Sequence, residues 1–173
     1  MDSTTPYLLT GLGAAFGVSL ASIGSATAST VSASYAMTCK GVMSHVPIII
    51  SGVLGIYGLI IGAILAKILV SEDIIGIKQG CANLAAGLTV GGACYASGLG
   101  MASFVMNCLY GGDYNTRQQK STPLNGHMQA LLTKPDDPPL REPYPVTTKF
   151  VVMMVFLEAL GLYGLIVALL LIG

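Results

Sequence analysis

Four long apolar stretches, separated by polar connections, dominate the pattern of this 173-residue chain. A helix that crosses a bilayer needs about 20 mostly apolar residues, and each of these stretches is long enough. They extend from near Tyr7 to near Met37, from near Val46 to Val70, from near Gln79 to Tyr110, and from near Lys149 to the C-terminus. The pattern therefore predicts an all-α membrane protein with four transmembrane helices.

The first stretch is either a membrane helix or a cleaved leader. The residues before it include one charged side chain, Asp2, and no Lys or Arg, whereas a signal peptide begins with a positive region. The stretch is also longer than a signal core. We expect it to remain in the membrane as a helix.

The connection between the third and fourth stretches, residues 111–149, is long and polar. It holds five of the eight Lys and Arg residues and six of the eight prolines. Positive charge favours the cytoplasmic side, so we expect this loop in the cytoplasm and both termini on the opposite, lumenal side. Its proline content argues against a packed domain, although a short helix near His127–Leu132 is weakly indicated.

An internal repeat divides the chain into two halves. Residues 54–60 and 160–166 agree at six of seven positions, at a shift of 106 residues. The first and third stretches are both rich in Gly, Ala and Ser, and each is followed by a bulkier stretch. The sequence therefore predicts two tandem helical hairpins, residues 1–75 and 76–173, that enter the membrane from the same side as a parallel repeat.

Small residues recur at every fourth position in the first and third stretches, which places them in rows on one helix face. Such rows allow helix backbones to approach closely. They either line the tight inner circumference of a ring of copies or pack the four helices of one chain together, and the sequence leaves both open. The rows are Gly13, Gly17, Ala21 and Ser25 in the first stretch and Gly92, Ala96 and Gly100 in the third.

Composition excludes several classes of function. The chain is 53% hydrophobic and only 9% charged, against about 25% charged in a soluble domain. Its zero net charge provides no basic surface for a nucleic acid. It lacks a phosphate-binding loop and a nucleophile–base pair, so we expect no cofactor, no metal and no enzyme activity of the chain alone. The cysteines fit no zinc, redox or disulfide pattern; they are Cys39, Cys81, Cys94 and Cys108.

One carboxylate, Glu158, lies near the middle of the fourth stretch. It is the only acidic or basic side chain well inside a predicted helix, because Lys67 and Lys78 lie near helix ends and can snorkel. A charge at that depth costs roughly 2.5–3.5 kcal/mol, and burial favours the neutral acid. Intramembrane carboxylates are rare and usually functional, so we predict that Glu158 takes up and releases a proton. A purely structural hydrogen bond is the alternative.

The repeat and the helix spacing supply candidate neighbours for this carboxylate. Gly52 occupies the position of Glu158 in the first hairpin, so one carboxylate serves four helices. Tyr163 lies about one turn away, and Ser51 and Ser97 lie at a similar depth. These three side chains could donate hydrogen bonds to the carboxylate or could serve only in packing.

These residues resemble the 16 kDa proteolipid family of V-type ATPases. Residues 157–169 resemble the last helix of that family, and residues 85–91 resemble the start of its third. Residues 47–52, followed by Ile56-Tyr57-Gly58, resemble its second helix. The resemblance covers all four predicted helices, and the fourth-helix motif is the most specific.

The resemblance implies a ring of identical or mixed proteolipids that turns as a rotor in a vacuolar or other acidic membrane. A separate soluble sector would hydrolyse ATP, and the ring would contact the d subunit of the central stalk and the a subunit of the stator, which bears a membrane arginine. Glu158 would receive a proton from a cytoplasmic half-channel and cross the lipid as a neutral acid. It would lose the proton near the arginine, because an opposite charge favours the carboxylate.

The chain departs from the family in two regions. Its loop at 111–149 is long where the family loop is usually short, and residues 25–44 match loosely. Both regions are expected on the cytoplasmic side, so they leave the contact with the stalk open. A sister proteolipid carries its carboxylate in the first hairpin, and Gly52 argues against that identity.

Related rings move sodium, which needs several oxygen ligands around the carboxylate. No glutamine lies deep in the third predicted helix, since the glutamines are Gln79, Gln118, Gln119 and Gln129. The sequence therefore favours protons over sodium.

A structural four-helix protein, such as a junction component, is a further alternative, and it would tolerate glutamine in place of Glu158. A stand-alone channel would need more polar residues along a pore.

Overall fold

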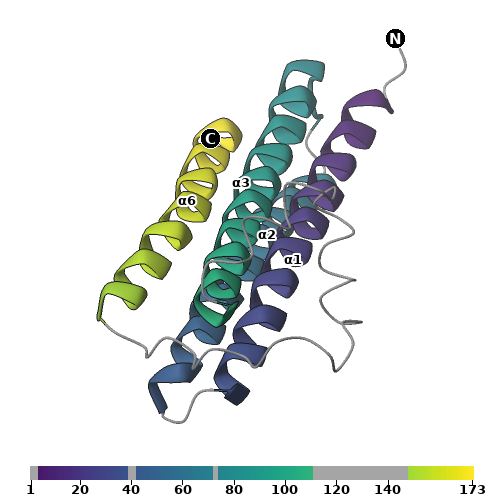
Figure 1. The fold of residues 1–173 in the computed structure, drawn as a ribbon. Helices are drawn as coiled ribbons and strands as arrows, with labels where there is room; N and C mark the ends of the chain where they lie inside the picture. Colours follow the sequence, from purple (N-terminus) through teal and green to yellow (C-terminus); the bar gives the residue numbers. More distant parts are fainter. Residues whose placement is uncertain (1–3, 39–41, 72–73, 111–147) are drawn as a thin grey trace, which may run out of the picture.

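The computed structural model describes residues 4–38, 42–71, 74–110 and 148–173. Within these ranges the chain forms four long helices and no strand (Figure 1). The helices are α1 (Thr5–Thr38), α2 (Val46–Val70), α3 (Ile77–Tyr110) and α6 (Thr148–Ile172), and a short 3-10 helix, η1 (Val42–His45), precedes α2. Each long helix is apolar enough to cross a membrane, which confirms the predicted fold. The helix suggested near residue 127 lies outside the described residues.

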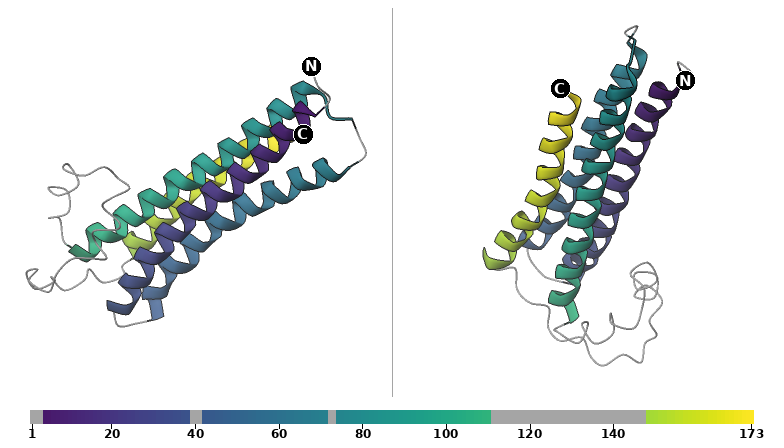
Figure 2. Two further views of the ribbon diagram at one scale, coloured as in Figure 1. Left: turned by 90° about the vertical axis from the view of Figure 1, so that its right-hand side faces the viewer. Right: turned by 90° about the horizontal axis from the view of Figure 1, so that it is seen from above.

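The four helices lie side by side in one bundle (Figure 2). α1 packs against both α3 and α2, whereas α6 packs mainly against α3 and also touches α2. Both chain ends lie at the same end of the bundle, as four crossings require (Figure 2). At 34 residues, α1 and α3 are each about 50 Å long, so both extend beyond a hydrocarbon core of about 30 Å.

Glycines set the distance between α1 and α3. A Cβ atom built at Gly87 would lie 1.9 Å from the carbonyl oxygen of Gly13, and one at Gly98 would lie 2.2 Å from that of Gly24. No side chain fits at such distances, so the two backbones are in direct contact. Without a hydrophobic driving force between helices in lipid, this close van der Waals packing is a main source of their association.

The two hairpins repeat the same contacts between their helices. A Cβ built at Gly58 of α2 would lie 2.3 Å from Ala21 Cβ of α1, and one at Gly164 of α6 would lie 2.3 Å from Ala93 Cβ of α3. Residues 106 apart in α2 and α6, and 72 apart in α1 and α3, therefore occupy equivalent places. The repeat seen in one sequence motif thus extends to helix packing.

Side-chain contacts connect the helices at both ends of the bundle. At the end where α6 begins, the ring of Phe150 stacks on Tyr35 with centroids 5.3 Å apart and lies 5.2 Å from Phe104. At the other end, Asn83 Nδ2 donates a buried 3.1 Å hydrogen bond to Thr10 Oγ1. These contacts join α1 and α3 at both ends and anchor the start of α6 on them.

The outer surface of the bundle is apolar. Large side chains such as Ile49, Leu59 and Phe156 are more than half exposed, which an isolated soluble protein would rarely tolerate. Among the described residues the lysines lie toward the helix ends: Lys67, Lys78 and Lys149. This distribution fits a surface covered by lipid along the middle of the helices.

Candidate functional site

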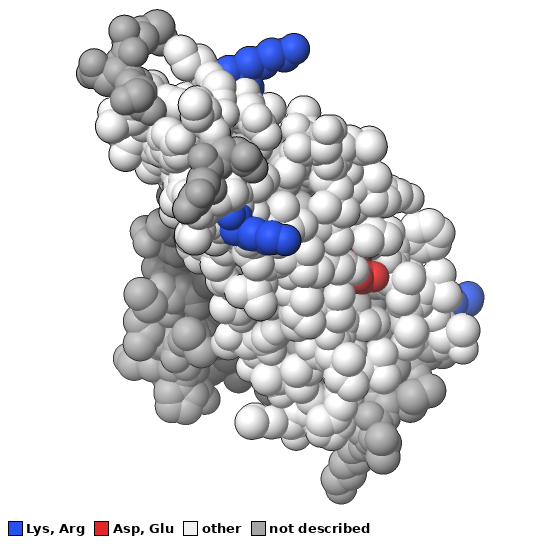
Figure 3. Space-filling model, turned by 180° about the vertical axis from the view of Figure 1, so that it is seen from behind, with Lys and Arg blue, Asp and Glu red and all other residues white. Residues whose placement is uncertain are grey.

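Glu158 lies within α6, half-buried at the side of the helix that approaches α2. It is the only Asp or Glu among the described residues. From behind, the molecule shows a single red acidic patch set in an otherwise white, uncharged area (Figure 3). The structure therefore places the predicted carboxylate at mid-helix depth on an apolar surface, where its ionisation is costly.

The hydroxyl of Tyr57, from α2, donates a hydrogen bond to Glu158 Oε1. This contact joins the two hairpins, because Tyr57 and Glu158 belong to opposite halves of the repeat. A phenol hydroxyl can donate to the ionised carboxylate and also to the carbonyl oxygen of the neutral acid. The pair can therefore persist through a change in protonation.

Gly161 allows α2 to come close enough for this contact. A Cβ atom built at Gly161 would lie 2.5 Å from Leu54 Cδ2 and 3.6 Å from Tyr57 Cδ2. Gly161 lies about one helical turn from Glu158 and so sets the separation of α2 and α6 beside the carboxylate. A larger residue there would move Tyr57 away from Glu158.

Ser97 of α3 contacts the residue next to the carboxylate. Its buried hydroxyl donates to the main-chain carbonyl oxygen of Leu157. The first hairpin has the equivalent bond, 3.0 Å from Ser25 Oγ to the carbonyl oxygen of Ser51. Ser97 therefore holds the backbone of α6 beside Glu158 and directs its hydroxyl to that backbone rather than to the carboxylate.

The other two predicted neighbours lie elsewhere. Ser51 is buried between α1 and α2, where its Oγ is 3.0 Å from Ser29 Oγ and donates to the carbonyl oxygen of Ile48 at 2.9 Å. Tyr163 lies on α6 and is 60% exposed. The structure thus joins Glu158 to Tyr57, the repeat counterpart of Tyr163. The signal that could have identified Tyr57 was the repeat itself, since both tyrosines occupy the same place in it.

The two rows of small residues have different surroundings. In α1, Gly13, Gly17 and Ala21 are buried within the chain, against α3 and α2. In α3, Gly92 and Ala96 are exposed, and a Cβ atom at Gly92 would meet nothing within 4 Å. The small residues of α1 therefore pack the helices of one chain together, whereas Gly92 and Ala96 of the α3 row remain exposed on the surface of the bundle.

The described residues contain no group of three or more His, Cys, Asp or Glu side chains that could hold a metal ion. The described cysteines, Cys81, Cys94 and Cys108, are free thiols. Within the described part of the chain, Glu158 is held by one phenol, which is a sparse oxygen set for a hard cation. The arrangement suits the gain and loss of a proton better than the capture of a bare metal ion.

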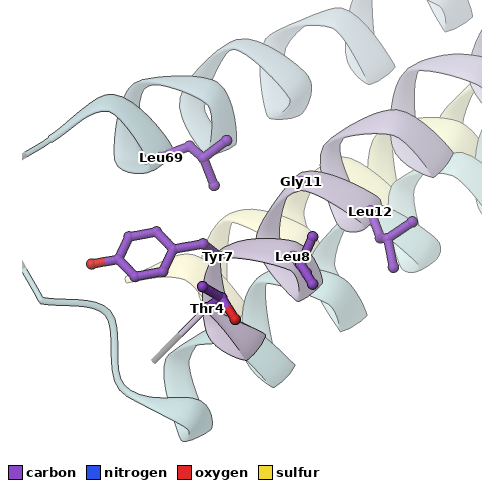
Figure 4. A pocket seen from close by; sticks show the side chains of 6 residues that line it. All are labelled: Thr4, Tyr7, Leu8, Gly11, Leu12 and Leu69. Atoms are coloured by element: carbon purple, nitrogen blue, oxygen red, sulfur yellow. The ribbon is translucent and has the colours of Figure 1, made fainter. Parts of the chain in front are cut away.

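An open apolar pocket of about 540 Å³ lies between the start of α1 and the end of α2 (Figure 4). Its lining comprises Thr4, Tyr7, Leu8, Gly11, Leu12 and Leu69. It contains no charged residue, and Glu158 does not line it. The carboxylate therefore lies at a contact between two helices and not in this pocket.

Comparison with known proteins matches residues 127–171 to the ATP synthase C subunit family. The chain is also 30% identical to subunit c' of the V-type proton ATPases of Eremothecium gossypii and Saccharomyces cerevisiae, over 95% of this chain and 80% of each relative. It is 30% identical to the 16 kDa proteolipid of the V-type proton ATPase of Ascaris suum, over 99% of this chain and 86% of that relative. With this identity over nearly its whole length and four membrane-spanning helices in the part that the structure describes, the chain belongs to the family of V-type proton ATPase proteolipid subunits.

Proposed function

We propose that this chain is a rotor-ring subunit that carries protons on Glu158 through the membrane sector of a V-type ATPase. The observation that supports this most directly is the placement of Glu158. The one described carboxylate lies at mid-helix on an apolar surface and is held by a phenol. The relatives are named as subunits of a proton ATPase, which favours a proton as the transported ion.

Lipid and protein surroundings act on Glu158 in opposite directions as the ring turns. When Glu158 faces lipid, burying its ionised carboxylate would cost roughly 2.5–3.5 kcal/mol, so the side chain passes through the lipid as the neutral acid. Beside the arginine of the stator's a subunit, the positive charge favours the anion and releases the proton. Moving one charge against 100 mV takes about 2.3 kcal/mol, so the work must come from ATP hydrolysis in the soluble sector.

Tyr57 is a positioning residue in this cycle. Its hydroxyl holds Glu158 at the contact between α2 and α6 instead of leaving the side chain free to turn into the lipid. A hydrogen bond to a charged group contributes about 1.5–3 kcal/mol, so Tyr57 favours the anion at the moment of release. It also keeps the neutral acid oriented for the next exchange.

The orientation in the membrane follows from charge. The connection at 111–149 carries most of the cationic side chains, so it faces the cytoplasm. The membrane that it adjoins is that of a vacuole or another acidic organelle. Both termini lie at one end of the bundle and so face the lumen (Figure 2). The cytoplasmic end of the bundle would meet the d subunit of the central stalk.

Carbodiimide labelling of the membrane-bound chain, mapped by mass spectrometry, tests this function. We expect Glu158 to be labelled near neutral pH, because carbodiimides attack protonated carboxyl groups in apolar surroundings, and we expect added sodium to have no effect. Protection by sodium would replace the proton with a sodium ion as the cargo. Absence of labelling at every pH would indicate a purely structural hydrogen bond and would contradict proton carriage.

Tyr57→Phe should lower ATP-driven proton transport about tenfold, because it removes one hydrogen bond to a group that becomes charged. The matched control is Tyr163→Phe, which removes the same hydroxyl from the exposed repeat counterpart. Acidification of sealed vesicles reports the rate. Equal losses in the two variants would show that the contact of Tyr57 with Glu158 has no special role in transport.

A further inference from the structure

We propose that Ser25 and Ser97 are positioning residues for proton carriage. Their hydroxyls anchor α2 and α6 on the α1–α3 pair, so that Tyr57 of α2 meets Glu158 of α6. The proposal rests on the proton-carrying function proposed above and adds two residues that act on the carboxylate from other helices. Each hydroxyl donates to a main-chain carbonyl oxygen of a neighbouring helix and not to the carboxylate itself.

The two serines direct their hydroxyls out of their own helices. A serine or threonine hydroxyl in a helix commonly donates to a carbonyl oxygen of the same helix, three or four residues earlier, as Thr89 of α3 does. Ser25 of α1 instead donates to the carbonyl oxygen of Ser51 in α2. Ser97 of α3 donates to the carbonyl oxygen of Leu157 in α6. Both hydrogen bonds therefore join one helix to the backbone of another.

These hydrogen bonds occupy equivalent places in the repeat. The two serines are 72 residues apart and the two acceptors are 106 residues apart, the same shifts that relate the close helix contacts. In each hairpin the small-residue helix thus holds the bulkier helix by one carbonyl group, directly before position 52 or 158. The first hairpin has no acid at this position, but its bulkier helix carries Tyr57. The pair of serines therefore fixes both partners of the Tyr57–Glu158 contact.

Each serine lies beside a glycine at a close contact between α1 and α3. Gly24 precedes Ser25, and Gly98 follows Ser97. A Cβ atom built at Gly98 would lie 2.2 Å from the carbonyl oxygen of Gly24, so the two backbones are in direct contact there. α1 and α3 also share the most extensive contact of the described helix pairs. The two serines are thus attached to a fixed base.

Four contacts form a closed circuit through the four helices. In order around the bundle they are Gly24 with Gly98, Ser97 with Leu157, Glu158 with Tyr57, and Ser51 with Ser25. Glycines, serine hydroxyls and main-chain carbonyls neither gain nor lose a proton in water. A change of charge during the cycle is therefore confined to the contact of Glu158 with Tyr57. The other three contacts keep the helices in place, so the phenol is in position when the proton returns.

Removing one serine hydroxyl should weaken the Tyr57–Glu158 contact without unfolding the bundle. The carbonyl that loses the serine keeps its hydrogen bond within its own α-helix, and alanine is the best helix former. Hydrogen bonds between membrane helices are modest, and their average strength corresponds to about threefold in an equilibrium constant. We therefore expect a partial loss of transport and an unfolding temperature close to that of the unmodified chain.

ATP-driven acidification of sealed vesicles, with the full chain in its membrane complex, tests the proposal. Ser25→Ala and Ser97→Ala should each lower the initial rate by up to about threefold. The double variant should approach, and not exceed, the loss of about tenfold expected for Tyr57→Phe. The matched control is Ser19→Ala, which removes the same hydroxyl from α1 where it donates within its own helix, and should leave the rate unchanged.

Combination with Tyr57→Phe separates positioning from a general effect on packing. In a chain that already lacks the Tyr57 hydroxyl, Ser25→Ala and Ser97→Ala should cause no further loss. Carbodiimide labelling of Glu158 is a second readout. It should become faster in both serine variants, as in Tyr57→Phe, because a carboxyl group released from the phenol is free to meet the reagent in the lipid.

Two results would overturn the proposal. One is an equal loss of transport from the serine variants with and without Tyr57→Phe, which would make both serines general packing residues. The other is unchanged transport and labelling in both serine variants. Because the serines belong to different hairpins, misfolding of one variant leaves the other to decide the question. Neither result bears on proton carriage, which fails only if Glu158→Gln still transports, so the two proposals are distinguishable.

Discussion

Glu158→Gln is expected to reduce ATP-driven proton transport to background while leaving the bundle folded. Glutamine has nearly the same shape as the neutral acid but cannot ionise, so it cannot exchange a proton in either half of the cycle. The amide oxygen of glutamine can still accept the hydrogen bond from the Tyr57 hydroxyl, and a neutral side chain replaces a neutral acid, so the chain should keep its stability. Vesicle acidification and thermal unfolding in detergent measure the two effects.

Glu158→Asp is the matched control for this result. It keeps the carboxylate but shortens the side chain by one methylene, which moves the oxygens away from the Tyr57 hydroxyl. We expect it to retain partial transport, well above the glutamine variant. Full transport by Glu158→Gln would exclude Glu158 as the proton carrier and favour the structural four-helix alternative.

Gly87→Ala is expected to destabilise the protein by about 1–3 kcal/mol or more, the usual cost of overpacking. The added methyl group would lie 1.9 Å from the carbonyl oxygen of Gly13, and the obstructing atoms belong to backbone that cannot rotate away. α1 and α3 would have to separate along their contact. Thermal unfolding of the purified chain in detergent measures the loss.

The control for this effect lies five residues along the same helix. Gly92→Ala adds the same methyl group where nothing in the described part of the chain lies within 4 Å, so it should leave the stability within about 0.5 kcal/mol of the original chain or raise it slightly. Similar unfolding temperatures for the two variants would contradict the close contact between α1 and α3. Because both changes replace glycine with alanine in α3, helix propensity cannot explain a difference.

The sequence alone determined the four membrane helices and singled out Glu158 as the candidate proton carrier. Bilayer thickness requires long apolar runs, and all four were recognisable, with bounds within about two residues of those in the structure. The cost of burying a charge made Glu158 conspicuous in an apolar helix. The repeat motif was visible at 54–60 and 160–166, and the structure extends it to the contacts of Gly58 and Gly164.

Only the tertiary structure decided which residues surround the acid. The repeat makes Tyr57 and Tyr163 equivalent in sequence, and proximity along α6 favoured Tyr163, one turn or so from Glu158. Within one chain, however, the second hairpin has a neighbour only on the side of the first, so Tyr57 reaches the carboxylate and Tyr163 remains exposed. The same asymmetry buries the small-residue row of α1 and leaves the row of α3 open, because spacing fixes a helix face but not its partner.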